Sequence, residues 1–369
     1  MKTEMKNVCS LLLMSFVLVV SVVSVKAQKH TMEWGNTTRE FLLYKPSTST
    51  EGVPVVYYLH GLGDNIDRWD SDMGFAQLAE TWGWAIVIPQ ALKVQGYSMW
   101  NAGLGGTADD AGFLIAILDS LIDNGVVNPD SVFFTGFSMG GFMTHRMAIE
   151  YGDRITACAP VSGLISFQMA EEVPVAPVRL MHIHGTSDAT VGYDGNSAYF
   201  GTIGIGVDSI ISYWTEWNGC SETATIDTFP DSRNDGLRFV RYLYSDGDAD
   251  VVLIKVIGGD HNWYSEPSND VDYTNEIYKF FKGTGNGELG MAEKPLGGGV
   301  FMIYPNPSDG VLNVCVDRAT IVECYDMGGR MMLRQNVPNG DTELCLRGCP
   351  SGIYLLRDTY GHSQRVMIY

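Results

Sequence analysis

The chain has 369 residues, enough for one large domain or two ordinary ones, and its 45% of hydrophobic residues can fill a sizeable core. Its formal net charge of -19 argues against a nucleic-acid or anionic-membrane partner, because phosphate groups would be repelled. An uncharged substrate is favoured instead.

The first 27 residues have the pattern of a secretory signal peptide. Lysines at positions 2 and 6 precede an apolar run from about Leu11 to Val25, and Val25-Lys26-Ala27 resembles a cleavage site. The alternative is a membrane anchor, but this run is shorter than the roughly 20 residues that a spanning helix needs. We expect cleavage after Ala27, export, and no membrane span in the mature chain.

Short apolar runs alternate with segments of helical period from residue 28 to 284. This alternation is typical of an α/β domain, with a mostly parallel sheet covered by helices on both faces. A hairpin should turn at Gly35-Asn36, and a final helix should end at Gly283. Another helix is predicted over 107–125, with Thr107 as its N-cap. Buried strands are predicted within residues 53–60, 84–89, 131–136, 178–185 and 251–258.

The character of the sequence changes after residue 284. Residues 285–300 are glycine-rich and lack apolar periodicity, so they are predicted to form a flexible linker. From 301 to 369, short strand-like runs are separated by turn residues, which predicts a small all-β sandwich. Four of the seven cysteines lie there, and export would allow them to pair, but the sequence does not choose among the connectivities. Their spacing matches no zinc site, and we predict neither a metal nor a cofactor.

The stretch Gly136-Phe137-Ser138-Met139-Gly140 fits the G-x-S-x-G pattern between a predicted strand and a predicted helix. In this context the pattern indicates a nucleophile elbow, which holds its serine in a strained conformation at a sharp turn. Small neighbours are needed because strand and helix approach closely there. Ser138 is therefore predicted to be a nucleophile, with a turn residue as the alternative.

A serine hydroxyl needs a general base, and the base needs a carboxylate to orient it. In α/β-hydrolases the acid and then the histidine follow the serine along the chain. Asp188 follows one predicted strand and His261 follows the next, so both should lie at the carboxyl edge of the sheet. Asp188 is preferred as the acid, with Asp194 and Asp260 as alternatives.

Four other histidines are weaker candidates for the base. His60 precedes the serine, and His145 lies in the helix after it, pointing away. His182 and His184 alternate within a predicted buried strand, where packing or loop stabilisation is the expected role.

An oxyanion hole needs two backbone N–H groups. We expect one from Met139, after the nucleophile, and one from Leu62, in a loop that glycines at 61 and 63 allow to turn sharply. Three further residues are expected to bind substrate in the cleft, with core packing as an equal alternative: Trp100, Asn101 and Trp263.

With these residues in place, the segment from 30 to 284 resembles carbohydrate esterase family one, which includes feruloyl esterases, acetylxylan esterases and polyhydroxybutyrate depolymerases. The resemblance rests on "LHGLGDN", "WNAG", "VFFTGFSMGG", "HIHGTSDATVGYDGN" and "GGDHNW", in that order. It implies an α/β-hydrolase fold and a catalytic triad of Ser138, Asp188 and His261. Ala189 and Tyr264 stand where the family commonly has prolines, so the loops around the acid and the base are expected to differ in shape.

The resemblance implies a secreted serine esterase that acts on feruloyl or acetyl esters of plant polysaccharide. A polyester substrate is the alternative, and a catalytically inactive surface binding protein is the alternative of another class. The intact triad argues against the inactive protein.

The tail from about residue 301 resembles the C-terminal sorting domain of the type IX secretion system, through "IYPNPSDGVLNV", "VECYDMGGRMM" and "PSGIYLLR". This resemblance implies contact with the type IX machinery and a secreted or surface-attached protein. A carbohydrate-binding sandwich is the alternative, although the tail has few aromatic residues to form a sugar platform.

Overall fold

The computed structural model of the chain describes residues 27–47, 52–68, 75–283 and 301–368, the last range with short gaps at 305–307, 309, 317–318, 327–329 and 359–362. The predicted signal sequence up to residue 26 and the predicted linker at 285–300 lie outside the described residues. Within the described ranges, no helix combines the length and the apolar character needed to cross a bilayer.

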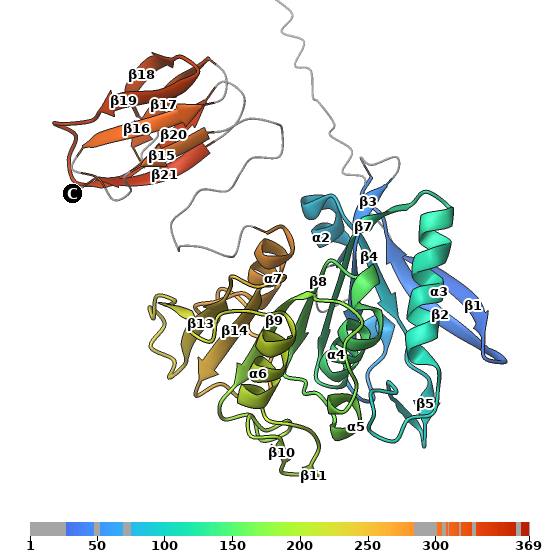
Figure 1. Cartoon of the computed structure of the whole chain (residues 1–369). Helices are drawn as coiled ribbons and strands as arrows, with labels where there is room; N and C mark the ends of the chain where they lie inside the picture. Colours follow the sequence, from blue (N-terminus) through green and yellow to red (C-terminus); the bar gives the residue numbers. More distant parts are fainter. Residues whose placement is uncertain are drawn as a thin grey trace, which may run out of the picture.

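A ten-stranded sheet forms the centre of the segment that ends at Phe281, in the order β1-β2-β4-β3-β7-β8-β9-β14-β13-β12 (Figure 1). The central strands from β4 to β14 are parallel, and antiparallel strands complete both edges. The strands are β1 (Gln28–Trp34), β2 (Thr37–Tyr44), β3 (Val53–Leu59), β4 (Ala85–Pro89), β7 (Val127–Phe137), β8 (Ala157–Val161), β9 (Arg179–Gly185), β12 (Thr225–Thr228), β13 (Arg238–Tyr244) and β14 (Val251–Ile257).

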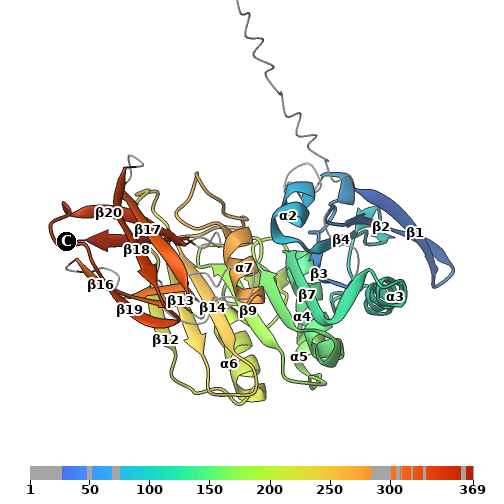
Figure 2. The ribbon, with the colours of Figure 1, turned by 90° about the horizontal axis from the view of Figure 1, so that it is seen from above.

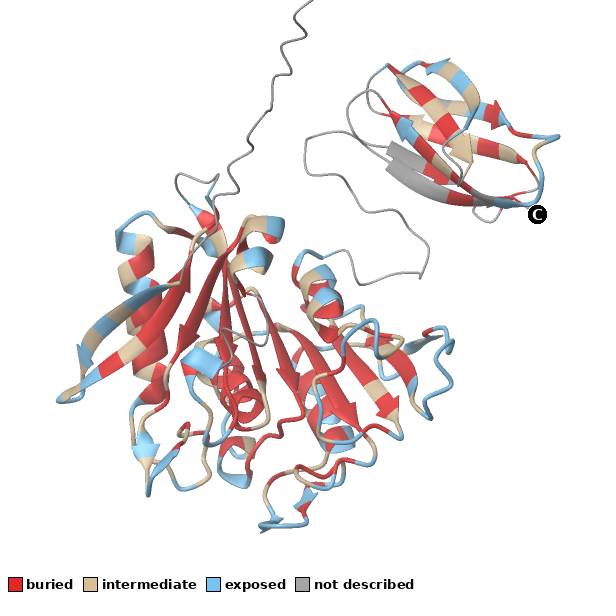
Figure 3. Cartoon of the chain, turned by 180° about the vertical axis from the view of Figure 1, so that it is seen from behind, coloured by how far each residue is buried: buried red, intermediate tan, exposed pale blue. Residues whose placement is uncertain are grey.

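Helices cover both faces of this sheet (Figure 2). On β3, Val55 and Tyr57 belong to one buried cluster and Val56 and Tyr58 to the other, since successive side chains of a strand point to opposite faces. The central strands are buried along most of their length (Figure 3), which explains their nearly continuous apolar sequences. One cluster includes α3 (Asp110–Asp123), α4 (Met139–Tyr151) and α6 (Val207–Trp217), and the other includes α2 (Phe75–Trp82) and α7 (Tyr273–Phe281).

The predicted hairpin and final helix are confirmed. The first turn lies at Gly35-Asn36, where both residues have positive φ, as a two-residue hairpin turn requires. The final helix α7 stops before Gly283, whose φ is 75°. The N-cap predicted for α3 was wrong, because the side chain of Asp109 rather than Thr107 accepts the hydrogen bond from the amide of Gly112.

The C-terminal residues form two antiparallel sheets, in the orders β15-β16-β19 and β18-β17-β20-β21. Side chains from both sheets, among them Leu312, Val314, Val322 and Leu356, share one buried cluster, as in a sandwich. The strands are β15 (Phe301–Tyr304), β16 (Val311–Val316), β17 (Thr320–Asp326), β18 (Met331–Val337), β19 (Gly340–Cys345), β20 (Gly352–Asp358) and β21 (Ser363–Ile368).

Candidate active site

Ser138 lies at the turn between β7 and α4 in a conformation that L residues rarely adopt, with φ 57° and ψ −121°. Such a residue costs about 1–3 kcal/mol and persists only where its surroundings fix it. The Ser138 amide donates to the carbonyl of Val161 at 2.9 Å, and the Ser138 carbonyl accepts from the amide of Gly141 at 2.8 Å. A Cβ atom on Gly140 would overlap the carbonyl of Leu59, so only glycine fits beside this turn.

Asp188 and His261 are brought together from the ends of β9 and β14. Oδ2 of Asp188 lies 2.7 Å from Nδ1 of His261, and the carboxylate is fully buried. Its other oxygen, Oδ1, accepts hydrogen bonds from the amides of Thr190 at 2.9 Å and Val191 at 2.8 Å. The two carboxylate oxygens therefore have different partners, which fixes the orientation of the group.

The two alternative acids are placed elsewhere. Asp194 is exposed and accepts hydrogen bonds from the amide and the side chain of Asn196. Asp260 is also exposed and accepts from the hydroxyl of Tyr264 at 2.6 Å. Among the three carboxylates considered, Asp188 is the one that contacts His261.

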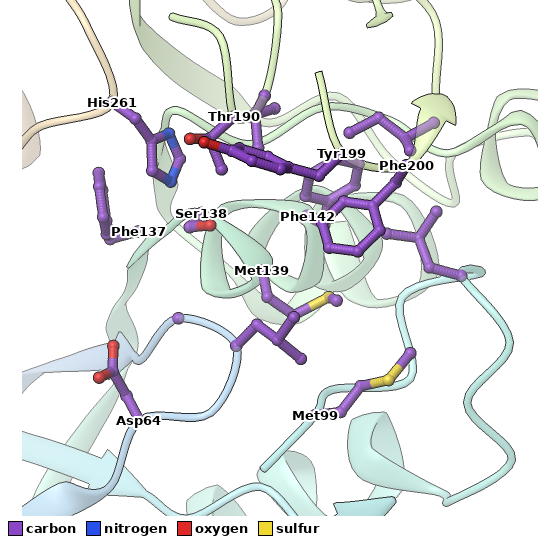
Figure 4. Close-up of a pocket in the computed structure, with 15 residues that line it drawn as sticks. Asp64, Met99, Phe137, Ser138, Met139, Phe142, Thr190, Tyr199, Phe200 and His261 are labelled. Carbon is purple, nitrogen blue, oxygen red and sulfur yellow. The ribbon is translucent and has the colours of Figure 1, made fainter. Parts of the chain in front are cut away.

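Ser138 and His261 line the same cavity, and Figure 4 shows the imidazole pointing toward the serine hydroxyl. The ring of Phe137 lies beside His261, with 4.7 Å between the ring centroids. The cavity thus brings a nucleophile candidate and a base candidate together, and the base candidate contacts the carboxylate of Asp188.

The loop after β3 also lies close to Ser138. A Cβ atom on Gly61 would lie 3.6 Å from Cβ of Ser138, and Gly63 has a φ of 77° that favours glycine. Leu62, between them, lines the cavity, as does Met139. Met139 is the first residue of α4, so the helix itself offers no acceptor for its amide.

His60 holds this loop in place, a role that the sequence did not reveal. Its Nδ1 lies 2.7 Å from the carbonyl of Gly61, and its Nε2 lies 3.1 Å from the amide of Ala91. Since a carbonyl only accepts and an amide only donates, His60 must be neutral with its proton on Nδ1. Burial lowers its pKa and favours the same neutral form.

The structure does not support the expectation that Trp100, Asn101 and Trp263 line the cavity. Trp100 is completely buried, and its indole N–H donates to the carbonyl of His60 at 2.9 Å. The side chain of Asn101 donates to the carbonyl of Ala108. Trp263 packs edge-on against Tyr58 and donates to the hydroxyl of Thr274. All three support surrounding structure, and none is among the residues that line the cavity.

The cavity measures about 640 Å³ and has mainly apolar walls. Phe142 lies four residues after Ser138, so helical spacing from the nucleophile could have identified it. Tyr199 and Phe200 lie in the turn between β10 (Asn196–Ser197) and β11 (Gly201–Thr202), and they are 73% and 66% exposed. Nothing local in the sequence indicated that this hairpin would reach the cavity. The other apolar residues of the lining are Leu62, Met99, Leu104, Phe137, Met139, Val191 and Ile203.

Tyr264, which stands where a proline was expected, anchors the loop that carries His261. Its hydroxyl donates to Oδ1 of Asp260 and accepts from the amide of the same residue at 2.9 Å. Its ring is buried against Phe239 and Tyr273. The loop is therefore fixed by hydrogen bonds rather than by a proline. Across the described ranges, no group of His, Cys, Asp and Glu side chains is arranged to hold a metal ion.

Comparisons with known proteins find similarity to esterases. The chain is 24% identical over 233 residues to a bifunctional acetylxylan esterase/xylanase of Neocallimastix patriciarum, covering 63% of this chain and 32% of that protein. It is 24% identical over 237 residues to feruloyl esterase B of Piromyces equi, covering 60% of this chain and 42% of that protein. The chain thus spans less than half the length of either relative.

Among solved structures, an acetyl xylan esterase from Aspergillus awamori shares the fold, with a TM-score of 0.51 and 16% identity over 69% of this chain and 99% of that one. Residues 302–368 match the family described as secretion system C-terminal sorting domain, which indicates a secreted or cell-surface protein. Residues 33–224, more than half of the chain, match the family described as Putative esterase. The chain therefore belongs to this esterase family and carries a C-terminal sorting domain.

Proposed function

We propose that the protein is a serine carboxylic ester hydrolase with Ser138 as nucleophile, His261 as general base and Asp188 as the acid that orients it. The observation that carries this proposal is the 2.7 Å contact between Asp188 and His261, a residue that lines the same cavity as Ser138. The strained backbone of Ser138 supports it further, since such strain is typical of a nucleophile elbow.

In the proposed reaction, Oγ of Ser138 attacks the ester carbonyl and its proton passes to Nε2 of His261. Asp188 accepts the hydrogen bond from Nδ1 and stabilises the imidazolium that forms. The amides of Leu62 and Met139 bind the negative oxygen of the tetrahedral intermediate. His261 then gives its proton to the departing alcohol, and water releases the acyl group by the same steps.

A feruloyl ester of plant polysaccharide is the substrate that the cavity favours. An acetyl group would leave most of the roughly 640 Å³ unfilled, whereas an aromatic acyl group could contact Phe142, Tyr199 and Phe200. Asp64 lies away from these aromatic side chains (Figure 4), where its carboxylate could accept hydrogen bonds from sugar hydroxyls. The similarity to a feruloyl esterase supports the same choice.

The test is a parallel measurement of hydrolysis with methyl ferulate, acetylated xylan and polyhydroxybutyrate. We expect the highest kcat/KM with methyl ferulate, and we expect Ser138→Ala to abolish turnover of every substrate while the protein stays folded. Activity confined to acetylated xylan would overturn the feruloyl assignment without affecting the nucleophile. Turnover by Ser138→Ala within tenfold of the unmodified protein would overturn the nucleophile.

A polyester is the second candidate substrate, because Tyr199 and Phe200 are exposed at the edge of the cavity and could contact an apolar polymer surface. Hydrolysis of polyhydroxybutyrate alone would favour this alternative. An inactive binding protein would hydrolyse none of the three substrates.

We further propose that residues 28–284 are a self-sufficient esterase domain and that residues 301–369 contact the type IX secretion machinery. The match of residues 302–368 to a sorting domain supports this division, as does the separate buried cluster of the C-terminal strands. Deletion of 301–369 in the native host should leave active esterase inside the cell envelope. Activity of the shortened chain in the medium would contradict the sorting role.

A further inference from the structure

Three buried histidines outside the proposed triad lie in contact with one another, and we call them the histidine chain: His145, His182 and His184. His145 comes from α4, and the other two lie two residues apart on β9, so they share one face of the sheet. All three side chains are completely buried. None of them takes part in the proposed reaction, so their burial needs another explanation.

The contacts of the histidine chain form one continuous line. The indole nitrogen of Trp214, on α6, lies 3.3 Å from Nδ1 of His145. Nε2 of His145 lies 3.2 Å from Nδ1 of His182, and Nε2 of His182 lies 3.1 Å from Nδ1 of His184. Nε2 of His184 lies 2.7 Å from the carbonyl oxygen of Val191.

The two ends of this line determine the position of every proton in it. The indole of Trp214 can only donate, and the carbonyl of Val191 can only accept. Each imidazole must therefore accept at Nδ1 and donate from Nε2, which makes all three neutral and gives them the same tautomer. A proton added to any ring would place two N–H groups face to face.

Burial supports the neutral state. It lowers the pKa of His145 to about 3 and the pKa of His182 well below the usual range. It also lowers the pKa of His184. Ionisable groups near the His184 end of the histidine chain are Asp188, whose Oδ2 lies 3.7 Å from Nε2 of His184, His261, and Tyr193, whose ring packs edge-on against His184. The histidine chain thus ends in a hydrogen bond to the carbonyl of Val191, close to the carboxylate of Asp188.

We propose that the histidine chain is a hydrogen-bond relay of fixed direction that positions the loop of Asp188 for catalysis. The loop is held from both sides: its carbonyl at Val191 accepts from the histidine chain, and its amides at Thr190 and Val191 donate to Asp188. Displacing that carbonyl moves the amides that orient the carboxylate, and with them the contact to His261. The histidines are positioning residues, since none lies among the residues that line the cavity.

The first test is spectroscopic and does not depend on enzymatic activity. Nitrogen-15 NMR of histidine-labelled full-length protein distinguishes the two neutral tautomers. We expect the histidine chain to carry its protons on Nε2 from pH 5.5 to 9. His60, whose contacts require a proton on Nδ1, serves as the internal control. A proton on Nδ1 in any member of the histidine chain, or titration of a member in that range, would overturn the proposal.

The second test is kinetic and rests on the proposed function. His182→Leu interrupts the line at its centre, and we expect it to lower kcat on a soluble ester about 10- to 100-fold with KM within threefold. His182→Gln keeps one acceptor and one donor in a side chain of similar reach, and it should restore kcat to within fivefold of the unmodified protein.

Ile183→Val is the matched control, because Ile183 lies on the same strand but belongs to the buried cluster on the opposite face. It should leave kcat unchanged. Equal kcat values for His182→Leu and Ile183→Val would contradict the positioning role.

If the unmodified protein hydrolyses no ester while the NMR pattern is as expected, the proposed function fails and the fixed direction of the relay stands. If His182→Leu does not fold, the NMR measurement on the unmodified protein still tests the direction of the relay, and a kcat of His182→Gln more than fivefold below that of the unmodified protein would still contradict the positioning role.

Discussion

Replacing Asp188 with asparagine should change the tautomer of His261 without unfolding the protein. Oδ1 of Asp188 accepts hydrogen bonds from two backbone amides. In the variant, the amide oxygen must occupy this position, because an NH₂ group there would face two donors. The NH₂ group then faces His261 at the position of Oδ2, and Nδ1 of His261 must become an acceptor. The proton moves to Nε2, which can no longer accept the proton of Ser138.

The expected loss in kcat is about 10⁴-fold, the effect of an equivalent change in a serine protease triad, which corresponds to roughly 5.5 kcal/mol of transition-state stabilisation. The assay is kcat and KM on methyl ferulate, with thermal unfolding to show that the fold is kept. Asp194→Asn and Asp260→Asn are matched controls on exposed carboxylates, and both should stay within about fivefold of the unmodified protein. Activity of Asp188→Asn within tenfold of the unmodified enzyme would refute the role of Asp188, and a larger loss in either control would reassign the acid.

Three further outcomes are expected. Stability to urea should fall as the pH drops from 8 to 5.5, because the unfolded chain binds protons on its histidines below about pH 6.5 while the buried histidines of the folded chain stay neutral. The loss should be roughly 1.4 kcal/mol for each of His145 and His182, and His184 should add to it in the same direction; constant stability over this range would contradict the neutral buried state. Gly140→Ala should prevent folding, because the added Cβ would overlap the carbonyl of Leu59, and a soluble variant with unchanged thermal unfolding would count against the tight elbow. Phe200→Ala should lower kcat/KM for methyl ferulate about tenfold and leave 4-nitrophenyl acetate nearly unaffected, since only the larger acyl group would reach the aromatic wall; equal losses on both esters would argue against an aromatic acyl site.

The parts of the fold that sequence could predict are those with a strong local signal. The buried strands of the sheet centre have continuous apolar runs, and the elbow at Ser138 has glycines that no other residue can replace. The strand β8 has no such local signal. It is short and rich in small residues, and it contains Pro160, which argues against a central strand. It nevertheless lies between β7 and β9, since its position is set by packing on both faces.

The residues that line the substrate side of the cavity could not be identified from local sequence patterns, for a different reason. Trp263 is only two residues from His261, yet its ring packs edge-on against Phe137, with 6.4 Å between the ring centroids, and it does not line the cavity. Tyr199 and Phe200 reach the cavity from a hairpin that is remote in sequence. The alternation of His182 and His184 within a predicted buried strand indicated packing or loop stabilisation, and His184 contacts the loop carbonyl of Val191. The path of α4, which brings His145 into contact with His182, is a tertiary feature.

The central claim is that Ser138 is an activated nucleophile, and covalent labelling tests it most directly. A fluorophosphonate probe should react with the unmodified protein, and peptide mass spectrometry should place the adduct on Ser138. Asp188→Asn should be labelled far more slowly, because its His261 cannot take the serine proton. Absence of labelling in the folded protein, or an adduct on any other residue, would contradict the account.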